Sequence, residues 1–131
     1  MQAFAQLLDT LVYTTSRNRK LALIADYLRQ TPDPDRGWAL AALTGELDFP
    51  AVKSSTVRNL MKERVDPVLW TLARDFVGDT AETASLMWPE AGLSAAEPDD
   101  TLTVSAVVGT LSSLTRATAP RELPKLLDRL D

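Results

Sequence analysis

The sequence predicts an all-α fold, a compact domain of about eight short helices. Apolar residues recur along the chain at the i, i+3, i+4, i+7 spacing of a single helix face. Proline, glycine, hydroxyl and acidic residues separate these apolar runs, at positions where helices typically begin and end. The chain has 131 residues, 45% hydrophobic and 24% charged, which are the length and composition of one globular domain.

The first three helices each follow from an apolar stripe and a terminal signal. We expect a helix over residues 3–12, and a second over residues 17–30 that the hydroxyls of residues 14–16 can cap. The prolines within residues 32–34 interrupt the chain and start a third helix. That helix should end at Gly45, because glycine is common just past a helix end.

The next three helices begin at capping residues. A loop over residues 46–53 precedes a fourth helix, for which residues 54–55, both serine, are the expected N-caps. Asp66, followed by proline, starts a fifth helix. Gly78 should end that helix, and the sixth then continues to near Trp88, which precedes a proline.

The last part of the chain begins with a stretch that has little periodicity. Residues 89–100 contain glycine, serine, proline and acids, and we expect a linker loop between residues 1–88 and residues 101–131. Leu102 to Leu114 has helical spacing, although its threonine and valine content also suits a strand, and we favour a helix. Pro120 opens a final amphipathic helix.

Composition excludes several classes of chemistry. The chain has no cysteine and no histidine, which removes disulfides, thiolate nucleophiles, Cys/His zinc sites and His-based triads. No run approaches a membrane span, so we expect no membrane partner. A cytoplasmic location is the default expectation, since a chain without cysteine does not indicate a redox compartment. Trp38 and Trp70 lie within apolar helical stretches and are expected in the core.

A first basic cluster stands at the expected start of the second helix. Ser16 is followed by three cations, Arg17, Arg19 and Lys20. Cations are disfavoured there because the helix dipole is positive at this end. Hydroxyls, cations and open backbone N–H groups together suit a phosphate. The simpler interpretation is a solvated basic turn that binds nothing.

A second basic cluster repeats the arrangement at the start of the fourth helix. Lys53, Ser54 and Ser55 could hold one phosphate together with the first N–H groups of the helix. Arg58 and Lys62 are four residues apart and therefore share a helix face. The simpler alternative is an ordinary N-cap with a basic surface face.

The remaining polar motifs suggest structure rather than catalysis. Asp79 and Glu82 have capping-box spacing, while Gly45 and Gly78 occupy helix-ending positions. Their capping roles account for both carboxylates, so we expect no catalytic residue. The acidic pairs lack the spacing of a metal-binding loop, so we expect no metal site.

The formal net charge of −4, taken as a total, argues against nucleic-acid binding. The distribution of charge along the chain does not. Residues 14–30 hold four cations and one acid, and residues 51–64 also hold four cations and one acid. Residues 65–131 hold five cations and eleven acids. The acidic total therefore conceals two local basic turns.

Three motifs, in order, resemble the N-terminal DNA-binding domain of bacterial ATP-dependent DNA ligases. They are Thr-Ser-Arg-Asn-Arg-Lys at residues 15–20, Leu-Thr-Gly-Glu-Leu at 43–47 and Phe-Val-Gly-Asp-Thr-Ala-Glu-Thr-Ala at 76–84. The similarity covers residues 1–88 and is weaker beyond. In that family the domain is helical and clamps the minor groove on both sides of a nick, while separate nucleotidyltransferase and OB-fold domains perform the chemistry.

The resemblance also implies roles for individual residues. Ser16, Arg17 and Lys20 would be structural or backbone-contacting, and residues 53–55 with Arg58 would form a phosphate-contacting turn. The family's adenylated lysine lies in a K-x-D-G motif, which this sequence lacks. We therefore expect no adenylyl transfer by this chain. ATP and a divalent metal are implied only for a parent ligase. The family's domain is also longer, so we expect this one to be truncated.

The sequence therefore leads to two functional hypotheses. The first is a non-catalytic DNA-binding module that grips nicked double-stranded DNA, works with ligase catalytic domains and is nucleoid-associated. The second is a helical protein-interaction domain whose acidic second half docks a repair partner such as a nuclease or helicase.

Overall fold

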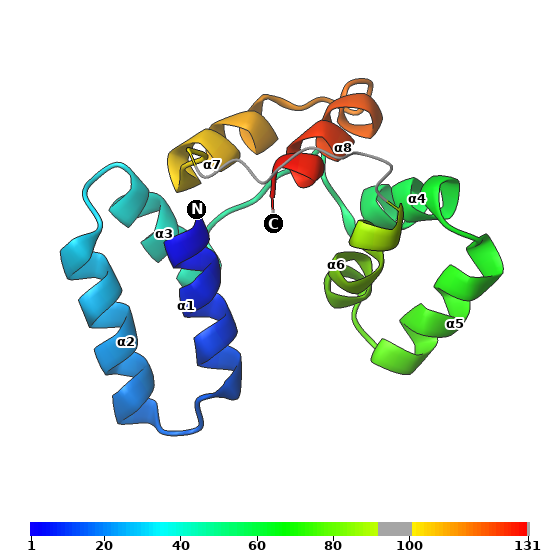
Figure 1. Ribbon diagram of the computed structural model, residues 1–131. Coiled ribbons are helices and arrows are strands. Elements are labelled where there is room, and N and C mark those ends of the chain that lie inside the picture. The colour runs from blue at the N-terminus through cyan, green and yellow to red at the C-terminus, as the bar shows by residue number, and fades with distance from the viewer. Residues whose placement is uncertain (92–100, 131) are drawn as a thin grey trace. The chain divides into compact units, whose positions relative to one another are not determined.

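The computed structural model describes residues 1–91 and 101–130. Within these ranges every regular element is a helix, eight in all, and the described chain holds no strand (Figure 1). The helices are α1 (Gln2–Tyr13), α2 (Arg17–Gln30), α3 (Asp35–Leu43), α4 (Ser54–Arg64), α5 (Pro67–Val77), α6 (Thr80–Ala91), α7 (Val104–Ser113) and α8 (Ala119–Arg129). The prediction of an all-α fold with about eight short helices is confirmed, as is the choice of helix for α7.

Two helix ends differ from the expectation. Lys53, not Ser54 or Ser55, is the N-cap residue of α4, and Ser54 is the first helical residue. Helix α6 runs through Ala91, so the first three residues of the expected 89–100 linker are helical. Proline lacks an N–H donor but has a helix-compatible φ, so it need not end a helix at its own position. The rest of that linker lies outside the described residues.

The chain divides into two compact units. One comprises residues 1–48 and 99–109, and the other comprises residues 49–98 and 110–131. The boundary passes through α7, whose first residues belong to the first unit and whose last residues belong to the second. The expectation that residues 1–88 and 101–131 are parts of one DNA-binding domain stays a prediction.

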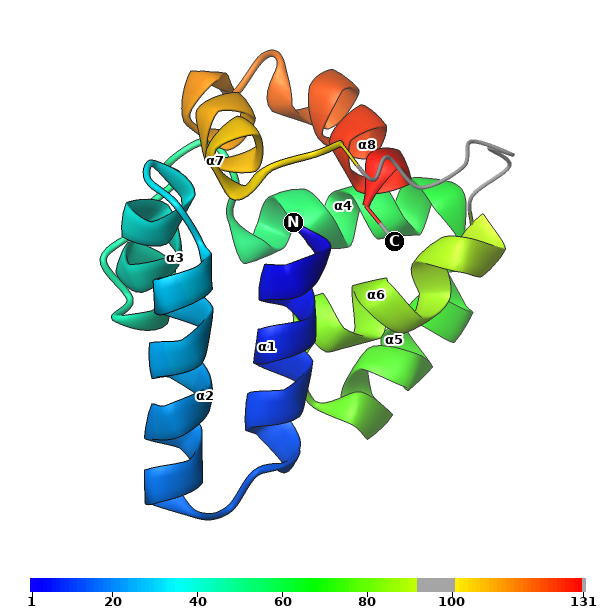
Figure 2. The ribbon, with the colours of Figure 1, turned by 60° about the vertical axis from the view of Figure 1, so that its left-hand side comes forward.

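In the first unit, α1 and α2 form a helical hairpin and lie side by side (Figures 1 and 2). The rings of Phe4 on α1 and Tyr27 on α2 are in tilted contact, with centroids 5.7 Å apart. The N-terminal amine donates to the carbonyl of Leu102 (2.8 Å), and Asp35 Oδ1 accepts from the N–H of Ser105 (3.0 Å). These bonds connect the start of α7 to the N-terminal ends of α1 and α3.

The second unit is built around α4, α5 and α6, which pack against one another (Figure 2). Met61, Trp70 and Ala84 form its buried centre, one from each helix. Helix α8 packs against α4 and buries Leu123 and Leu126. Apolar burial of this kind is the main favourable contribution to folding.

The two tryptophans expected in the core have different environments. Trp70 is 1% exposed, so its prediction is confirmed. Trp38 is 41% exposed, so its prediction is wrong. On the short helix α3 the fully buried position is Ala39. Each step along a helix turns the side chain by about 100°, so the larger neighbour points partly to solvent.

Glycines in the left-handed region end two helices. Gly45 has φ of 74°, its N–H donates to the carbonyl of Ala42 (3.2 Å), and the N–H of Glu46 donates to that of Ala41 (2.9 Å). These two bonds define a Schellman motif. The Leu-Thr-Gly-Glu-Leu stretch is therefore a helix terminus.

The second such turn joins α5 to α6. Gly78 has φ of 85°, and its N–H donates to the carbonyl of Arg74 (2.9 Å). Asp79 follows, and its Oδ1 accepts from the N–H of Glu82 (2.8 Å). The hydroxyl of Thr83, 1% exposed, donates to the carbonyl of Asp79. One short stretch thus ends one helix and caps the next.

Candidate nucleic-acid interface

The first basic turn is the start of α2. Ser16 is its N-cap residue, and its Oγ accepts from the N–H of Arg19 at 3.4 Å. The side chains of Arg17 and Arg19 are exposed, and Lys20 is half-buried. The first turn of α2 carries no acidic residue. Three cations therefore stand at the positive end of this helix dipole.

This arrangement is electrostatically unfavourable for the isolated fold. A cation in the first turn of a helix typically costs about 0.3–1 kcal/mol. An anion bound at the same place would interact favourably with the cations and with the N–H groups that have no intrahelical partner. The turn is therefore suited to hold a phosphate oxygen.

The second basic turn is the start of α4. The N–H of Lys53 donates to Oγ1 of Thr56 at 3.2 Å, so one helix-end donor is satisfied by the protein. The side chains of Lys53, Ser54 and Ser55 are all exposed. Two hydroxyls, one ammonium group and the next N–H groups of α4 are thus gathered at one exposed helix end.

A polar stripe continues from this turn along α4. Ser55, Arg58 and Lys62 have the i, i+3, i+7 spacing of one helix face, and all three side chains are exposed. At 1.5 Å per residue the stripe is about 10 Å long. Lys62 lies in the last turn, where the dipole favours a cation, so its presence there has an intrahelical reason as well. We call Ser55, Arg58 and Lys62 the α4 stripe.

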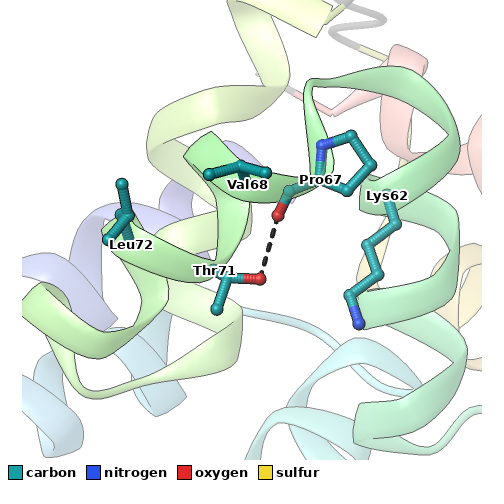
Figure 3. Close-up of a pocket in the computed structure, with 5 residues that line it drawn as sticks. All are labelled: Lys62, Pro67, Val68, Thr71 and Leu72. Atoms are coloured by element: carbon teal, nitrogen blue, oxygen red, sulfur yellow. Dashed lines mark hydrogen bonds between the residues drawn. The ribbon is translucent and has the colours of Figure 1, made fainter.

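The α4 stripe ends at a shallow pocket between α4 and α5 (Figure 3). The pocket has a volume of about 350 Å³ and is lined by Lys62, Pro67, Val68, Thr71 and Leu72. The Thr71 hydroxyl donates to the carbonyl of Pro67 at 2.9 Å. Lys62 therefore contributes the positive charge of an otherwise largely aliphatic lining.

Arg64 is less accessible than the other cations of α4, because it has partners within the protein. Arg64 packs over the ring of Trp88 and pairs with Asp128, with a nitrogen–oxygen distance of 3.5 Å. Arg64 is one of the four cations within residues 51–64. Its partners are 24 and 64 residues away, and no local sequence pattern reveals them.

The comparisons with known proteins are negative. No family model, curated protein or solved structure matches this chain. The basic turns and the pocket must therefore be interpreted from their own chemistry.

The expected site residues fall into two groups. Residues 16–20 lie in the first unit, and residues 53–62 lie in the second. Within the second unit one helix, α4, brings its whole group together from N-cap to last turn. Gly45, Gly78, Asp79 and Glu82 lie at the helix ends described above, outside both basic turns.

The described residues contain neither a membrane-spanning helix nor a metal-binding cluster. None of the described helices combines the length and the apolar character needed to cross a membrane. Across residues 1–91 and 101–130, no three acidic side chains are grouped closely enough to hold a metal ion.

Proposed function

We propose that this chain is the non-catalytic DNA-binding module of an ATP-dependent DNA ligase and that it grips nicked duplex DNA through backbone phosphates. The observation that carries the proposal is the start of α4, where Lys53, Ser54 and Ser55 are all exposed and lead into the α4 stripe. Such a set contacts phosphates without reading the base sequence.

The resemblance of three motifs supports the ligase part of the proposal. The motif at residues 15–20 contains the first basic turn, while those at 43–47 and 76–84 contain the glycine turns that end α3 and α5. The first motif thus contains candidate phosphate contacts, and the other two have a structural role as helix ends. Adenylyl transfer, with ATP and a divalent metal, would belong to other domains of the parent ligase, because K-x-D-G is absent here.

The rival hypothesis, a protein-interaction domain that docks through its acidic second half, is less well supported. Asp66 and Asp79 cap α5 and α6. Asp128 pairs with Arg64, and Glu122 pairs with Lys125 (3.1 Å). Four acidic residues in the described part of this region thus have partners within the protein.

The direct test is the affinity of the full chain for nicked duplex DNA, measured by fluorescence anisotropy at several salt concentrations. Each phosphate contact should add about 0.9 to the slope of log affinity against log salt. We expect a clear salt dependence, and a loss of affinity in the Lys53→Ala and Arg58→Ala variants with a smaller slope for each.

A matched control is Lys125→Ala. Lys125 is exposed, lies on α8 and pairs with Glu122, so its removal should leave DNA affinity nearly unchanged. Affinity that does not depend on salt, or equal affinity of the wild type and the Lys53→Ala and Arg58→Ala variants, would contradict the proposal. For the parent enzyme, we expect a K-x-D-G motif downstream in the same reading frame.

A further inference from the structure

The pocket between α4 and α5 has an unusual combination of charge and apolar surface. Val68 and Leu72 are 68% and 62% exposed, although both are large aliphatic side chains. Lys62 lines the same pocket from α4, on the side of Pro67 and Thr71 (Figure 3). A ligand that fits would therefore combine an anionic group with a carbon-rich surface.

The α4 stripe indicates that this ligand is a polymer. Ser55, Arg58 and Lys62 follow one face of α4 from the exposed helix start to the pocket. Three successive donors on a straight line suit several anions in a row. A nucleic-acid strand provides a phosphate at every repeat, with an apolar sugar between each pair of phosphates.

We propose that the pocket binds a deoxyribose of the DNA backbone, with the adjoining phosphate on Lys62 and the sugar carbons on Val68 and Leu72. The inference rests on the proposed function and adds an apolar subsite to it. Protein contacts to DNA go largely to phosphates and sugars, and proteins of the minor groove also place apolar side chains against the DNA. Because the pocket is shallow, it suits a sugar ring better than a large side chain of a protein partner, which would need a deeper cavity.

The experiment measures the binding of the full chain to nicked duplex DNA over a salt series. Val68→Thr and Leu72→Gln, singly and together, replace exposed aliphatic groups with polar ones. We expect the double variant to lose about five- to tenfold in affinity at every salt concentration, with an unchanged salt slope. Lys62→Gln should lower both the affinity and the slope, the latter by about 0.9.

Two controls share the chemistry but lie outside the pocket. Leu86 on α6 is 63% exposed, and Phe76 is 92% exposed one turn beyond Leu72 on α5. Leu86→Gln and Phe76→Gln should keep the affinity of the wild type. Circular dichroism of each variant establishes that its helices are intact.

The possible outcomes separate this inference from the proposed function. If the wild type binds DNA with salt dependence but the double variant binds equally well, the pocket inference is wrong while the proposed function stands. A loss with Leu86→Gln or Phe76→Gln as large as that of the double variant also overturns it. If the wild type does not bind nicked DNA, both the proposed function and the inference fail.

Discussion

The guanidinium of Arg64 lies over the indole ring of Trp88, with Cζ 4.3 Å from the ring centroid. Both residues also reach one atom, Oδ1 of Asp128. The Arg64 nitrogen is 3.5 Å from it, and the Trp88 Nε1–H donates to it at 3.2 Å. The cluster thus joins α4, α6 and α8 at one point, with the Arg64 and Asp128 side chains only 26% and 22% exposed.

This cluster has a consequence for the candidate interface. Arg64 ends the same helix that carries the α4 stripe, and its contacts fix the last turn of α4 against two other helices of the second unit. A cation–π contact contributes about 0.5–2 kcal/mol, whereas an exposed ion pair contributes about 0–1 kcal/mol. The helix that carries the stripe is therefore anchored at its last turn to α6 and α8.

We predict that Asp128→Ala lowers the free energy of unfolding by about 1.5–3 kcal/mol, because it removes a charged acceptor from two partly buried donors. Asp128→Asn should cost less, about 1 kcal/mol, since its amide oxygen can still accept from Trp88 while the charge attraction to Arg64 is lost. Urea unfolding of the full chain, followed by circular dichroism, measures both values.

The matched control for this pair is Asp26→Asn. Asp26 pairs with Arg29 at 3.1 Å, but the two side chains are 63% and 76% exposed. Exposed pairs contribute about 0–1 kcal/mol, so this substitution should have little effect. Equal changes for Asp26→Asn and Asp128→Ala would show that the cluster at Asp128 is no more than a surface pair.

The fold was largely predictable because its signals are local. The hydroxyl of Ser16, the carboxylate of Asp66 and the αL conformation of Gly78 each act within a few residues of their own position. Side-chain burial was less predictable. Trp38 and Trp70 both occupy apolar helical stretches, yet only tertiary packing decides that one is 41% exposed and the other 1%.

The candidate site shows the same limit. The basic turns at Ser16 and Lys53 could be recognised because capping residues and cations lie together in the sequence. The partners of Arg64 could not, since Trp88 and Asp128 come from other helices. The pocket beside Lys62 likewise depends on how α4 and α5 pack, which no periodicity specifies.

We predict that Gly45→Ala and Gly78→Ala each destabilise the protein by about 1–2 kcal/mol. Both glycines have positive φ, which costs an L residue this much. An added Cβ at either position meets no atom within 4 Å, so the loss would be conformational rather than steric. Asn, which tolerates the left-handed region better, should lose less than Ala at both positions. Urea unfolding of the four variants measures these differences.

Gly109 provides the opposite test. It lies inside α7, where an added Cβ also meets nothing within 4 Å. Alanine is favoured over glycine in a helix interior by about 0.5–1 kcal/mol, so Gly109→Ala should stabilise the protein. If Gly109→Ala destabilised the protein as much as Gly45→Ala, the positive φ of Gly45 could not be the cause of its destabilisation.

The last prediction separates stability from binding at the first basic turn. Arg17 is the first residue of α2, at the positive end of the helix dipole. Arg17→Gln should therefore raise the free energy of unfolding by about 0.3–1 kcal/mol while it weakens binding to nicked DNA. Arg29→Gln, in the last turn of the same helix, removes a favourable cation that pairs with Asp26 and should not stabilise the fold. A cation that destabilises its own helix suggests that a bound ligand compensates for the cost. If Arg17→Gln gains stability without losing DNA affinity, there is no longer a reason to place a phosphate at this turn.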